Sequence, residues 1–298
     1  MEVLKTGIGI DIGGTKIWAV LATEQGTIIE EVKLDTEKTR SGLLRQLDEL
    51  VGHFAAASFR QGMGTPYGVG IGLPGRVSEK LVQWVPNLPE LNGLDLGAHA
   101  DERWAIPARL QNDGQLALYG EQWLGAARSR QSVVMLTLGT GIGGGIMVDG
   151  KVLRGANGTA GSMGWLTMDM TDSGDPEQGW LERMVSGTGI HRRASRLSVP
   201  LSGRELFDRA AAGHPEALEL VHQIGYCIGG AVANLASVFD PELVLIGGGV
   251  SLQLDRMMPS LRSAMERYGS PSARDVPVAA AKLSEKAGVL GALRLVFL

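Results

Sequence analysis

Cysteine is almost missing from this chain: Cys227 is the single one among 298 residues. One cysteine excludes a disulfide within the chain and any metal site built from several cysteines. Such usage is typical of proteins from a reducing compartment, so we expect a cytoplasmic protein. Cys227 stands in an apolar segment with helical spacing, and we expect its thiol to be buried and inert.

Long apolar runs and an excess of positive charge are missing too. No run reaches the length needed to cross a bilayer, and the charged start Met1–Lys5 followed by an apolar run that Asp11 interrupts argues against a signal peptide. The formal net charge is −4, both signs are scattered, and a basic spot as dense as Arg192–Arg193 is short. These features argue against a membrane protein and against a nucleic-acid-binding protein.

Glycine, in contrast, is abundant. The chain holds 43 glycines, many of them gathered in a few loops, and 44% of its residues are hydrophobic. A chain of 298 residues with this composition can bury a large core, and its length is typical of two domains. Because a residue without a Cβ lets backbone N–H groups come close to a ligand, we expect the glycine-rich loops to be ligand loops.

Two glycine-rich hairpins have the composition of phosphate-binding turns. In Gly9–Lys16 an apolar strand leads through Asp11 into a turn of two glycines and a threonine, and Thr137–Ile146 repeats this order. Backbone N–H groups and a threonine hydroxyl bind phosphate oxygens, whereas Asp11 needs a divalent cation between itself and a phosphate. Either hairpin alone is also compatible with an ordinary β-turn. Together they favour a site that grips one phosphate chain from both sides.

Apolar patterning predicts two similar halves, each with a β-meander followed by helices. Apolar residues recur at helical spacing over Leu43–Phe54, and Ala217–Val238 reads as a long apolar helix. The strand after it meets Gly247–Gly249 and a helix, a common place for a nucleotide. The predicted strands are Thr6–Asp11, Lys16–Ala22, Thr27–Leu34, Tyr67–Leu73, Ala108–Gln111, Ser132–Leu138, Gly144–Val148, Lys151–Arg154 and Leu243–Ile246, with further helices ending at Leu124 and spanning Gln253–Arg267.

Six motifs, in order along nearly the whole chain, resemble the ROK family of sugar kinases. They are Asp11–Lys16, Gly72–Gly75, Asn112–Asp113, Leu138–Gly145, Asn157–Gly161 and Ile246–Gly249. The resemblance implies an α/β fold of the actin-like ATPase (ribonuclease H-like) type, with two α/β domains and a ligand cleft between them. We place the N-terminal domain at residues 1–113 and the C-terminal domain at residues 114–298, with the last helix packing back on the N-terminal domain. The resemblance also implies ATP and Mg²⁺ as cofactors and a homodimer.

The same resemblance assigns roles to single residues. It makes Asp113 the catalytic base, since phosphoryl transfer needs a carboxylate that accepts the proton of the attacking hydroxyl, and places Asn112 beside the sugar. Gly75 and Asn87 border the sugar as well. The implied phosphate and adenosine contacts are Gly13, Gly14, Thr15, Lys16, Thr140, Gly141, Gly248 and Gly249, and Asp11 holds Mg²⁺ through water. Simpler interpretations stay open: Asp113 is also a good helix N-cap, and the glycines can serve turns and close packing.

The segment that ends at Glu182 departs from the family pattern. Family members usually read Ala-Gly-Glu-x-Gly-His where this chain has Ser162 and Trp165. In the family the glutamate and the histidine contact the sugar, so Ser162 and Trp165 are the candidates for these contacts here. Glu182 matches a further glutamate that binds the sugar in the family. The departure puts glucose as the substrate in doubt.

A structural zinc site of the family falls in the same segment. There the histidine joins three cysteines, whereas this chain has Trp165 and, at the approximate cysteine positions, Ser173, Asp175 and Trp180. These residues are not a zinc donor set, so we expect no zinc and expect Trp165 and Trp180 to fill its place by packing. A buried Trp165 is favoured over an indole that stacks on a sugar ring.

The sequence therefore predicts an ATP-dependent sugar kinase that phosphorylates a hydroxyl, O6 above all, of a hexose or amino sugar, with Mg²⁺ and without zinc. Two alternatives stay open: a non-catalytic, sugar-sensing regulator of the same family, and a pseudo-kinase. Regulators carry a DNA-binding segment before the first phosphate-loop strand, which here begins within a few residues of Met1. Intact Asp11, Asp113 and phosphate turns argue against a pseudo-kinase.

Overall fold

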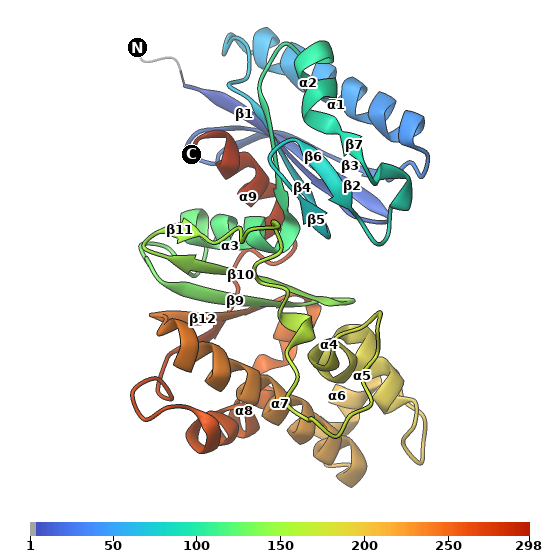
Figure 1. Cartoon of the computed structure of the whole chain (residues 1–298), viewed down its shortest axis with the longest axis vertical. Coiled ribbons are helices and arrows are strands. Elements are labelled where there is room, and N and C mark those ends of the chain that lie inside the picture. The colour runs from blue at the N-terminus through green and yellow to red at the C-terminus, as the bar shows by residue number, and fades with distance from the viewer. Residues whose placement is uncertain (1–3) are drawn as a thin grey trace. The chain divides into compact units, whose positions relative to one another are not determined.

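The computed structural model describes residues 4–298, so the first three residues of the predicted N-terminal domain and of the charged start Met1–Lys5 lie outside the described part. The chain forms two compact units (Figure 1). The first holds the chain up to Ser129, Val152–Ala160 and Glu285–Leu298, and the second holds Arg130–Lys151 and Gly161–Ser284. The domain limits at residues 113 and 114 stay a prediction.

A five-stranded sheet in the order β3-β2-β1-β4-β8 forms the base of the first unit. Its first three strands are antiparallel neighbours, and β4 and β8 run parallel to β1. The bounds are β1 Thr6–Ile12, β2 Lys16–Thr23, β3 Ile28–Asp35, β4 Val69–Leu73 and β8 Ala108–Asn112. All five strands agree with the sequence prediction to within two residues.

The central strand β1 alternates isoleucine and glycine, and this alternation positions the helices. Ile8, Ile10 and Ile12 belong to the apolar core that α1 (Arg40–Arg60) completes. The other face carries Gly7 and Gly9, and α9 (Lys286–Val296) approaches it so closely that a Cβ on Gly9 would lie 2.5 Å from the carbonyl oxygen of Val289. Because side chains alternate along a strand, Asp11 follows the glycines on the face toward α9.

Helix α3 (Asp113–Leu124) crosses α9 at an equally close contact. A Cβ on Gly120 would lie 2.4 Å from the carbonyl oxygen of Ala287. We expect Gly120→Ala to lower the free energy of unfolding by about 2 kcal/mol, because two backbones must separate to admit one methyl group. Urea denaturation measures this change.

The matched control is Gly52→Ala on the exposed side of α1, where an added Cβ meets nothing within 4 Å. That substitution removes backbone entropy from the unfolded chain, so we expect it to leave the free energy of unfolding unchanged or to raise it by about 0.5–1 kcal/mol. Equal effects of the two substitutions would contradict the close contact between the helices.

A small antiparallel sheet of three strands completes the first unit, in the order β5-β6-β7. Its strands are β5 Arg76–Val77, β6 Leu81–Trp84 and β7 Leu94–Asp95, with α2 (Leu96–Arg103) directly after them. The sequence analysis assigned no strands here. Two strands of two residues each are too short to show an alternation of apolar and polar side chains.

The second unit repeats the plan of the first, with a sheet in the order β11-β10-β9-β12-β13. Again the first strand pairs antiparallel with the second, and the later strands run parallel to it. The strands are β9 Val133–Leu138, β10 Ile142–Val148, β11 Lys151–Val152, β12 Leu243–Gly247 and β13 Val278–Ala280. The helices are α4 Trp180–Val185, α5 Gly187–Ala194, α6 Gly203–Ala211, α7 Pro215–Phe239 and α8 Leu254–Tyr268. The predicted duplication of a β-meander with helices is therefore present.

Cys227 lies on α7 and is only partly buried, which corrects the expectation of a fully buried thiol. The burial it has raises the pKa of the thiol, against the nearby charge of Arg193. A raised pKa disfavours the reactive thiolate and so supports the expectation of an inert thiol, which stays a prediction.

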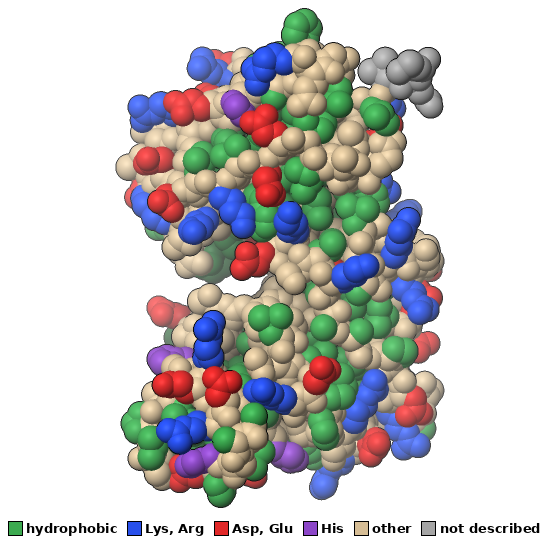
Figure 2. Space-filling view, turned by 180° about the vertical axis from the view of Figure 1, so that it is seen from behind, with side chains coloured by type: hydrophobic (Ala, Val, Ile, Leu, Met, Phe, Trp, Pro, Cys, Tyr) green, Lys and Arg blue, Asp and Glu red, His purple; other side chains and the backbone are tan. Residues whose placement is uncertain are grey.

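Two further observations concern the surface of the molecule. Among residues 4–298, no helix combines the length and the apolar character that a membrane crossing requires. On the face in Figure 2, Lys and Arg side chains are interspersed with Asp and Glu side chains. The exclusion of nucleic acid and membrane partners stays a prediction.

Candidate active site

The carboxyl group of Asp11 lies between the sheet and α9. A Cβ on Gly288 would lie 2.6 Å from Oδ2 of Asp11, and a Cβ on Gly72 would lie 3.1 Å from Oδ1. Burial, and secondarily the charge of Asp113, raise the pKa of Asp11 to about 7. Asp11 is therefore an acid that a bound cation would stabilise in its ionised form.

Asp113 lies at the start of α3, where β8 ends. Its Oδ1 accepts a hydrogen bond of 2.7 Å from the N–H of Gly114, and burial raises the pKa of its carboxyl group despite this bond. The N-cap of α3 is Asn112 and not Asp113, so the simpler interpretation of Asp113 is wrong. Asp113 therefore lies in the first turn of α3, and its carboxyl group is not needed as the cap of this helix.

Asn112 connects α3 with the sugar loop predicted at Gly75. Its Oδ1 accepts from the N–H groups of Gly114 and Gln115, and its Nδ2 donates to the carbonyl oxygen of Gly75 at 3.0 Å. Nδ2 carries a second hydrogen, so Asn112 can keep this bond and still donate to a sugar hydroxyl. Gly75 has a φ of 86°, and a Cβ there would lie 2.3 Å from the carbonyl oxygen of Trp84. Both conditions require glycine at this turn.

The first phosphate turn, Gly13–Lys16, joins β1 and β2 and is held by the chain after β3. The hydroxyl of Thr36 donates to the carbonyl oxygen of Gly13, its N–H donates to that of Thr15, and Lys38 donates to that of Gly14. Carbonyl oxygens repel phosphate, so their bonds with Thr36 and Lys38 favour an anion beside the turn. The N–H of Gly13 itself donates to the carbonyl oxygen of Lys16 at 2.9 Å. Asn87 lies against this turn, since a Cβ on Gly14 would lie 2.8 Å from the Cβ of Asn87.

The second phosphate turn, Gly139–Gly141, joins β9 and β10 and is held in the same way. The N–H of Gly187 donates to the carbonyl oxygen of Gly139 at 2.7 Å, and that of Thr188 donates to Thr140 at 3.4 Å. Gly248, with a φ of 77°, packs so tightly on this turn that a Cβ would lie 2.4 Å from the carbonyl oxygen of Leu138. Around Gly249 there is open space. The two turns thus share a design, one in each unit.

Glu182 lies on α4 and supports the second turn. Its Oε2 accepts from the N–H of Ile142 at 2.8 Å and lies 2.8 Å from where a Cβ on Gly141 would be. Ser162 precedes a short 3-10 turn that ends at Trp165. Contacts of Glu182, Ser162 and Trp165 with a sugar stay predictions.

Of the two tryptophans expected to pack where the family has its metal, only one packs against a core, and whether it replaces a metal stays a prediction. Trp180 is partly buried and packs against the core of the second unit. Trp165 is 55% exposed, so the expected burial of its indole is wrong. Met163 and Gly164 of the same 3-10 turn are buried, whereas Trp165 at its end is exposed, and an exposed indole retains the ability to stack on a sugar ring.

Gln115 is a supporting residue that the sequence analysis missed. Its side chain is fully buried on α3, and its Nε2 lies within 2.9–3.3 Å of the carbonyl oxygens of Arg154, Gly158 and Ala160. It therefore ties the Asn157–Gly161 motif, up to Ala160, to the helix that begins at Asp113. A glutamine two residues after Asp113 within an apolar helix was the available signal.

The residues present fit Mg²⁺ and ATP. Asp11 and Asp113 are oxygen donors, the charge of Asp113 contributes to the raised pKa of Asp11, and Mg²⁺ typically binds one or two carboxylates together with phosphates. For zinc, the described residues contain no group of three or more His, Cys, Asp and Glu side chains that could hold a metal ion. The absence of zinc stays a prediction that metal analysis of the purified protein tests.

Comparison with known proteins relates the chain to one family. The model of the ROK family matches residues 7–297. A glucokinase of Halalkalibacterium halodurans is 33% identical over 95% of this chain and 92% of its own length. The structure of a ROK family glucokinase from Streptomyces griseus in complex with glucose and AMPPNP matches 97% of this chain and 98% of that chain, with 28% identity and a TM-score of 0.78. The predicted fold class is confirmed by this likeness.

A transcriptional regulator of the ROK family, a homolog of the E. coli MLC protein, has a similar fold. Its structure matches 98% of this chain and 78% of that chain with a TM-score of 0.86, but only 22% of the residues are identical. At this identity the likeness concerns the fold alone.

Proposed function

Because the chain belongs to the ROK family, we propose that it is an ATP-dependent sugar kinase that phosphorylates a hydroxyl group, O6, of a hexose or amino sugar. The observation that carries the proposal is the placement of two carboxyl groups in the unit that holds the first phosphate turn. Asp11 lies against Gly72 and Gly288, Asp113 lies at the start of α3, and burial raises the pKa of both. A second turn of the same design supports it, as do relatives named glucokinase. A homodimer belongs to the same proposal.

In the proposed reaction each residue has a separate task. Asp113 accepts the proton of the attacking hydroxyl, and its raised pKa makes it a stronger base than an ordinary aspartate. Asn112 and Glu182 orient the sugar, Gly75 shapes the loop beside it, and the amides of the two turns bind the phosphates. When bound, Mg²⁺ neutralises the charge of the phosphates, and Asp11 is the residue that holds it.

A second candidate is a sugar-binding protein without catalysis, either a regulator or a pseudo-kinase. Ser162 and Trp165 favour it, because they replace two family residues that contact the sugar. The likeness in fold to a regulator is compatible with it. The two candidates differ in one respect that can be measured: only a kinase converts a bound sugar.

Release of ADP from MgATP tests the proposal against glucose, mannose, fructose, glucosamine, N-acetylmannosamine, N-acetylglucosamine and a β-glucoside. We expect turnover with one of these sugars at about 1–100 s⁻¹, the ordinary range for kinases, and a product phosphorylated at O6 by NMR. ATP without sugar is the control, and it should give little ADP. A sugar that binds calorimetrically while no ADP forms with any member of the panel would support the second candidate.

A further inference from the structure

A loop rich in aspartate lies beside α4 in the second unit. We define the acidic loop as residues 166–179. Its start is joined to α4, because the N–H of Leu181 in that helix donates to the carbonyl oxygen of Leu166 at 3.1 Å. Asp169, Asp172 and Asp175 each accept a hydrogen bond of 2.8–2.9 Å from the N–H two residues later. These short-range turns stiffen the loop locally but do not attach it to the rest of the unit.

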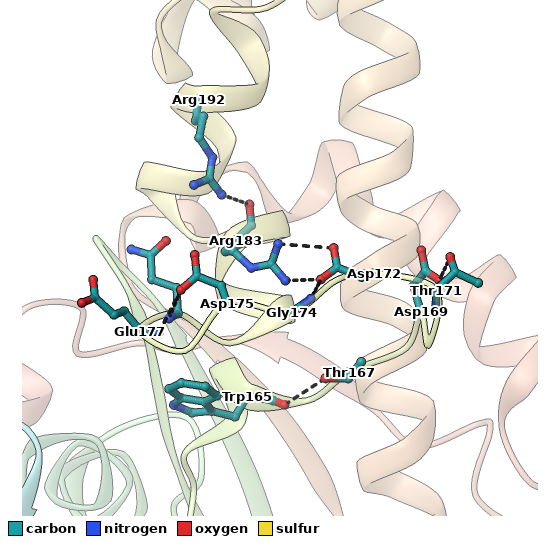
Figure 3. A network of polar contacts seen from close by, with 11 residues as sticks. Trp165, Thr167, Asp169, Thr171, Asp172, Gly174, Asp175, Glu177, Arg183 and Arg192 are labelled. Carbon is teal, nitrogen blue, oxygen red and sulfur yellow. Dashed lines mark hydrogen bonds and ion pairs between the residues drawn. The ribbon is translucent and has the colours of Figure 1, made fainter.

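Leu166 and Met168 of the loop pack against the core of the unit, and Arg183 of α4 adds a polar attachment. Its Nη2 lies 2.5 Å from Oδ1 of Asp172 and its Nη1 lies 3.3 Å from Oδ2, so the guanidinium and the carboxylate face each other with two hydrogen bonds (Figure 3). The side chains of Arg183 and Asp172 are only 17% and 25% exposed. The carbonyl oxygen of Arg183 also accepts from Nη2 of Arg192 on α5 at 3.1 Å. Helix α4 is thereby tied on one side to the acidic loop and on the other to α5.

Glu182 precedes Arg183 on the same helix and points to a different partner. Its Oε2 accepts from the N–H of Ile142, directly after the second phosphate turn. Helix α4 spans six residues, Trp180–Val185, and a helix of this length is not stable through its own hydrogen bonds. Its orientation, and with it the position of Glu182, depends on tertiary contacts: Leu181 and Val185 are buried in the core, and Arg183 binds Asp172 on the polar side.

We propose that the ion pair of Asp172 and Arg183 positions Glu182. Through Glu182 the pair sets the geometry of the second phosphate turn and of the contact between Glu182 and the sugar. The part of the inference that concerns the contact of Glu182 with the sugar rests on the proposed function. The part that concerns the hydrogen bond between Glu182 and Ile142 does not. Arginine suits this task, because its planar fork binds both carboxylate oxygens and so fixes an orientation, whereas lysine offers a single point charge.

The pair stays charged over the range in which enzymes are usually assayed. Hydrogen bonds from Arg183 and from the N–H of Gly174 hold the pKa of Asp172 below the ordinary value. The hydrogen bond with Asp172 in turn raises the pKa of Arg183. The contribution of Asp172 is therefore present above the ordinary pKa of aspartate and is lost only as the pH falls through the lowered one.

Kinetics of Asp172→Asn and Arg183→Lys test the inference, with the sugar that the panel identifies and with MgATP. We expect either substitution to lower kcat/KM for the sugar at least about tenfold, since a shift of a contact by about 1 Å can cost up to about a hundredfold. Asp169→Asn is the matched control: Asp169 lies in the same loop, its carboxyl group accepts from the N–H and the hydroxyl of Thr171, and we expect a change below about twofold. Unchanged kinetics of both Asp172→Asn and Arg183→Lys would overturn the inference.

A double-mutant cycle separates positioning from general destabilisation. If the ion pair acts through Glu182, then Asp172→Asn lowers kcat/KM by less than about twofold in a Glu182→Gln background. If Asp172→Asn lowers kcat/KM by the same factor in the Glu182→Gln background as in the wild type, the pair has only a structural role. All variants are compared at equal folded fraction, checked by circular dichroism.

Amide hydrogen exchange gives a readout that needs no catalysis. In Asp172→Asn and Arg183→Lys we expect the N–H of Ile142 to exchange at least about tenfold faster, whereas Asp169→Asn leaves it unchanged. If the N–H of Ile142 exchanges faster in these variants but the wild-type protein phosphorylates no sugar of the panel, the positioning role is supported and the proposed function is contradicted. Unchanged exchange in an active kinase would remove the positioning role alone.

Discussion

Asp113→Asn is expected to lower kcat for phosphoryl transfer by about a thousandfold while sugar and MgATP still bind. Asparagine has the shape of aspartate, and its Oδ1 can still accept from the N–H of Gly114 at the start of α3. What it loses is the ability to accept the proton of the attacking hydroxyl, a contribution typically of about 10²–10⁴ in rate. Steady-state ADP release gives kcat, and isothermal titration calorimetry gives the affinity for the sugar.

The matched control for this prediction is Asp95→Asn in the same unit. Asp95 also stands at the start of a helix and accepts from the N–H of Ala98 at 2.8 Å, but it caps α2 on the protein surface. Its substitution should leave kcat within about twofold, because an exposed cap affects stability by about 1 kcal/mol and not the reaction. Retained kcat in Asp113→Asn would overturn the assignment of Asp113 as the base.

Short-range patterns were enough to predict every strand of the first five-stranded sheet and the position of Asn112–Asp113 at the end of one of them. They also predicted four of the five strands of the second sheet, but not β13. The strands β1 and β9 are apolar runs that end at glycine turns, and Asn112–Asp113 directly follows the predicted strand Ala108–Gln111. In each of these cases the information lies within about ten neighbouring residues. The alternation of glycine and isoleucine in β1 also explains the position of Asp11. Only the glycine face admits α9, and Asp11 lies on this face.

Contacts between segments far apart in the sequence could not be predicted in this way. Thr36 and Lys38 hold the first phosphate turn, Gln115 holds the loop before Gly161, and Asp172 binds Arg183, yet none of these residues stands in a pattern that names its partner. The exposure of Trp165 was missed for a related reason. Its residue type favours burial, but a short turn between two glycine-rich segments decides where it lies.

The raised pKa of Asp11 implies that this residue destabilises the metal-free fold. In the unfolded chain Asp11 has an ordinary pKa of about 3.9, and in the folded protein burial and the charge of Asp113 raise it to about 7. Between these values the folded state binds more protons than the unfolded state, so the free energy of unfolding falls as the pH rises, and the full cost is reached above pH 7. A shift of about three pKa units corresponds to about 4 kcal/mol.

Asp11→Asn is therefore expected to make the metal-free protein more stable while it abolishes turnover. The gain in the free energy of unfolding should be about 1.5 kcal/mol at pH 5 and about 4 kcal/mol at pH 8, because asparagine has no proton to lose. Urea denaturation in EDTA at the two pH values measures it, with the exposed Asp35→Asn as a control that should change neither value. Mg²⁺ with ATP should stabilise the wild-type protein more than Asp11→Asn, since only a carboxylate holds the cation. A lower stability of Asp11→Asn than of the wild type at pH 8 in EDTA would show that Asp11 is held as a structural anion and not kept ready for a metal.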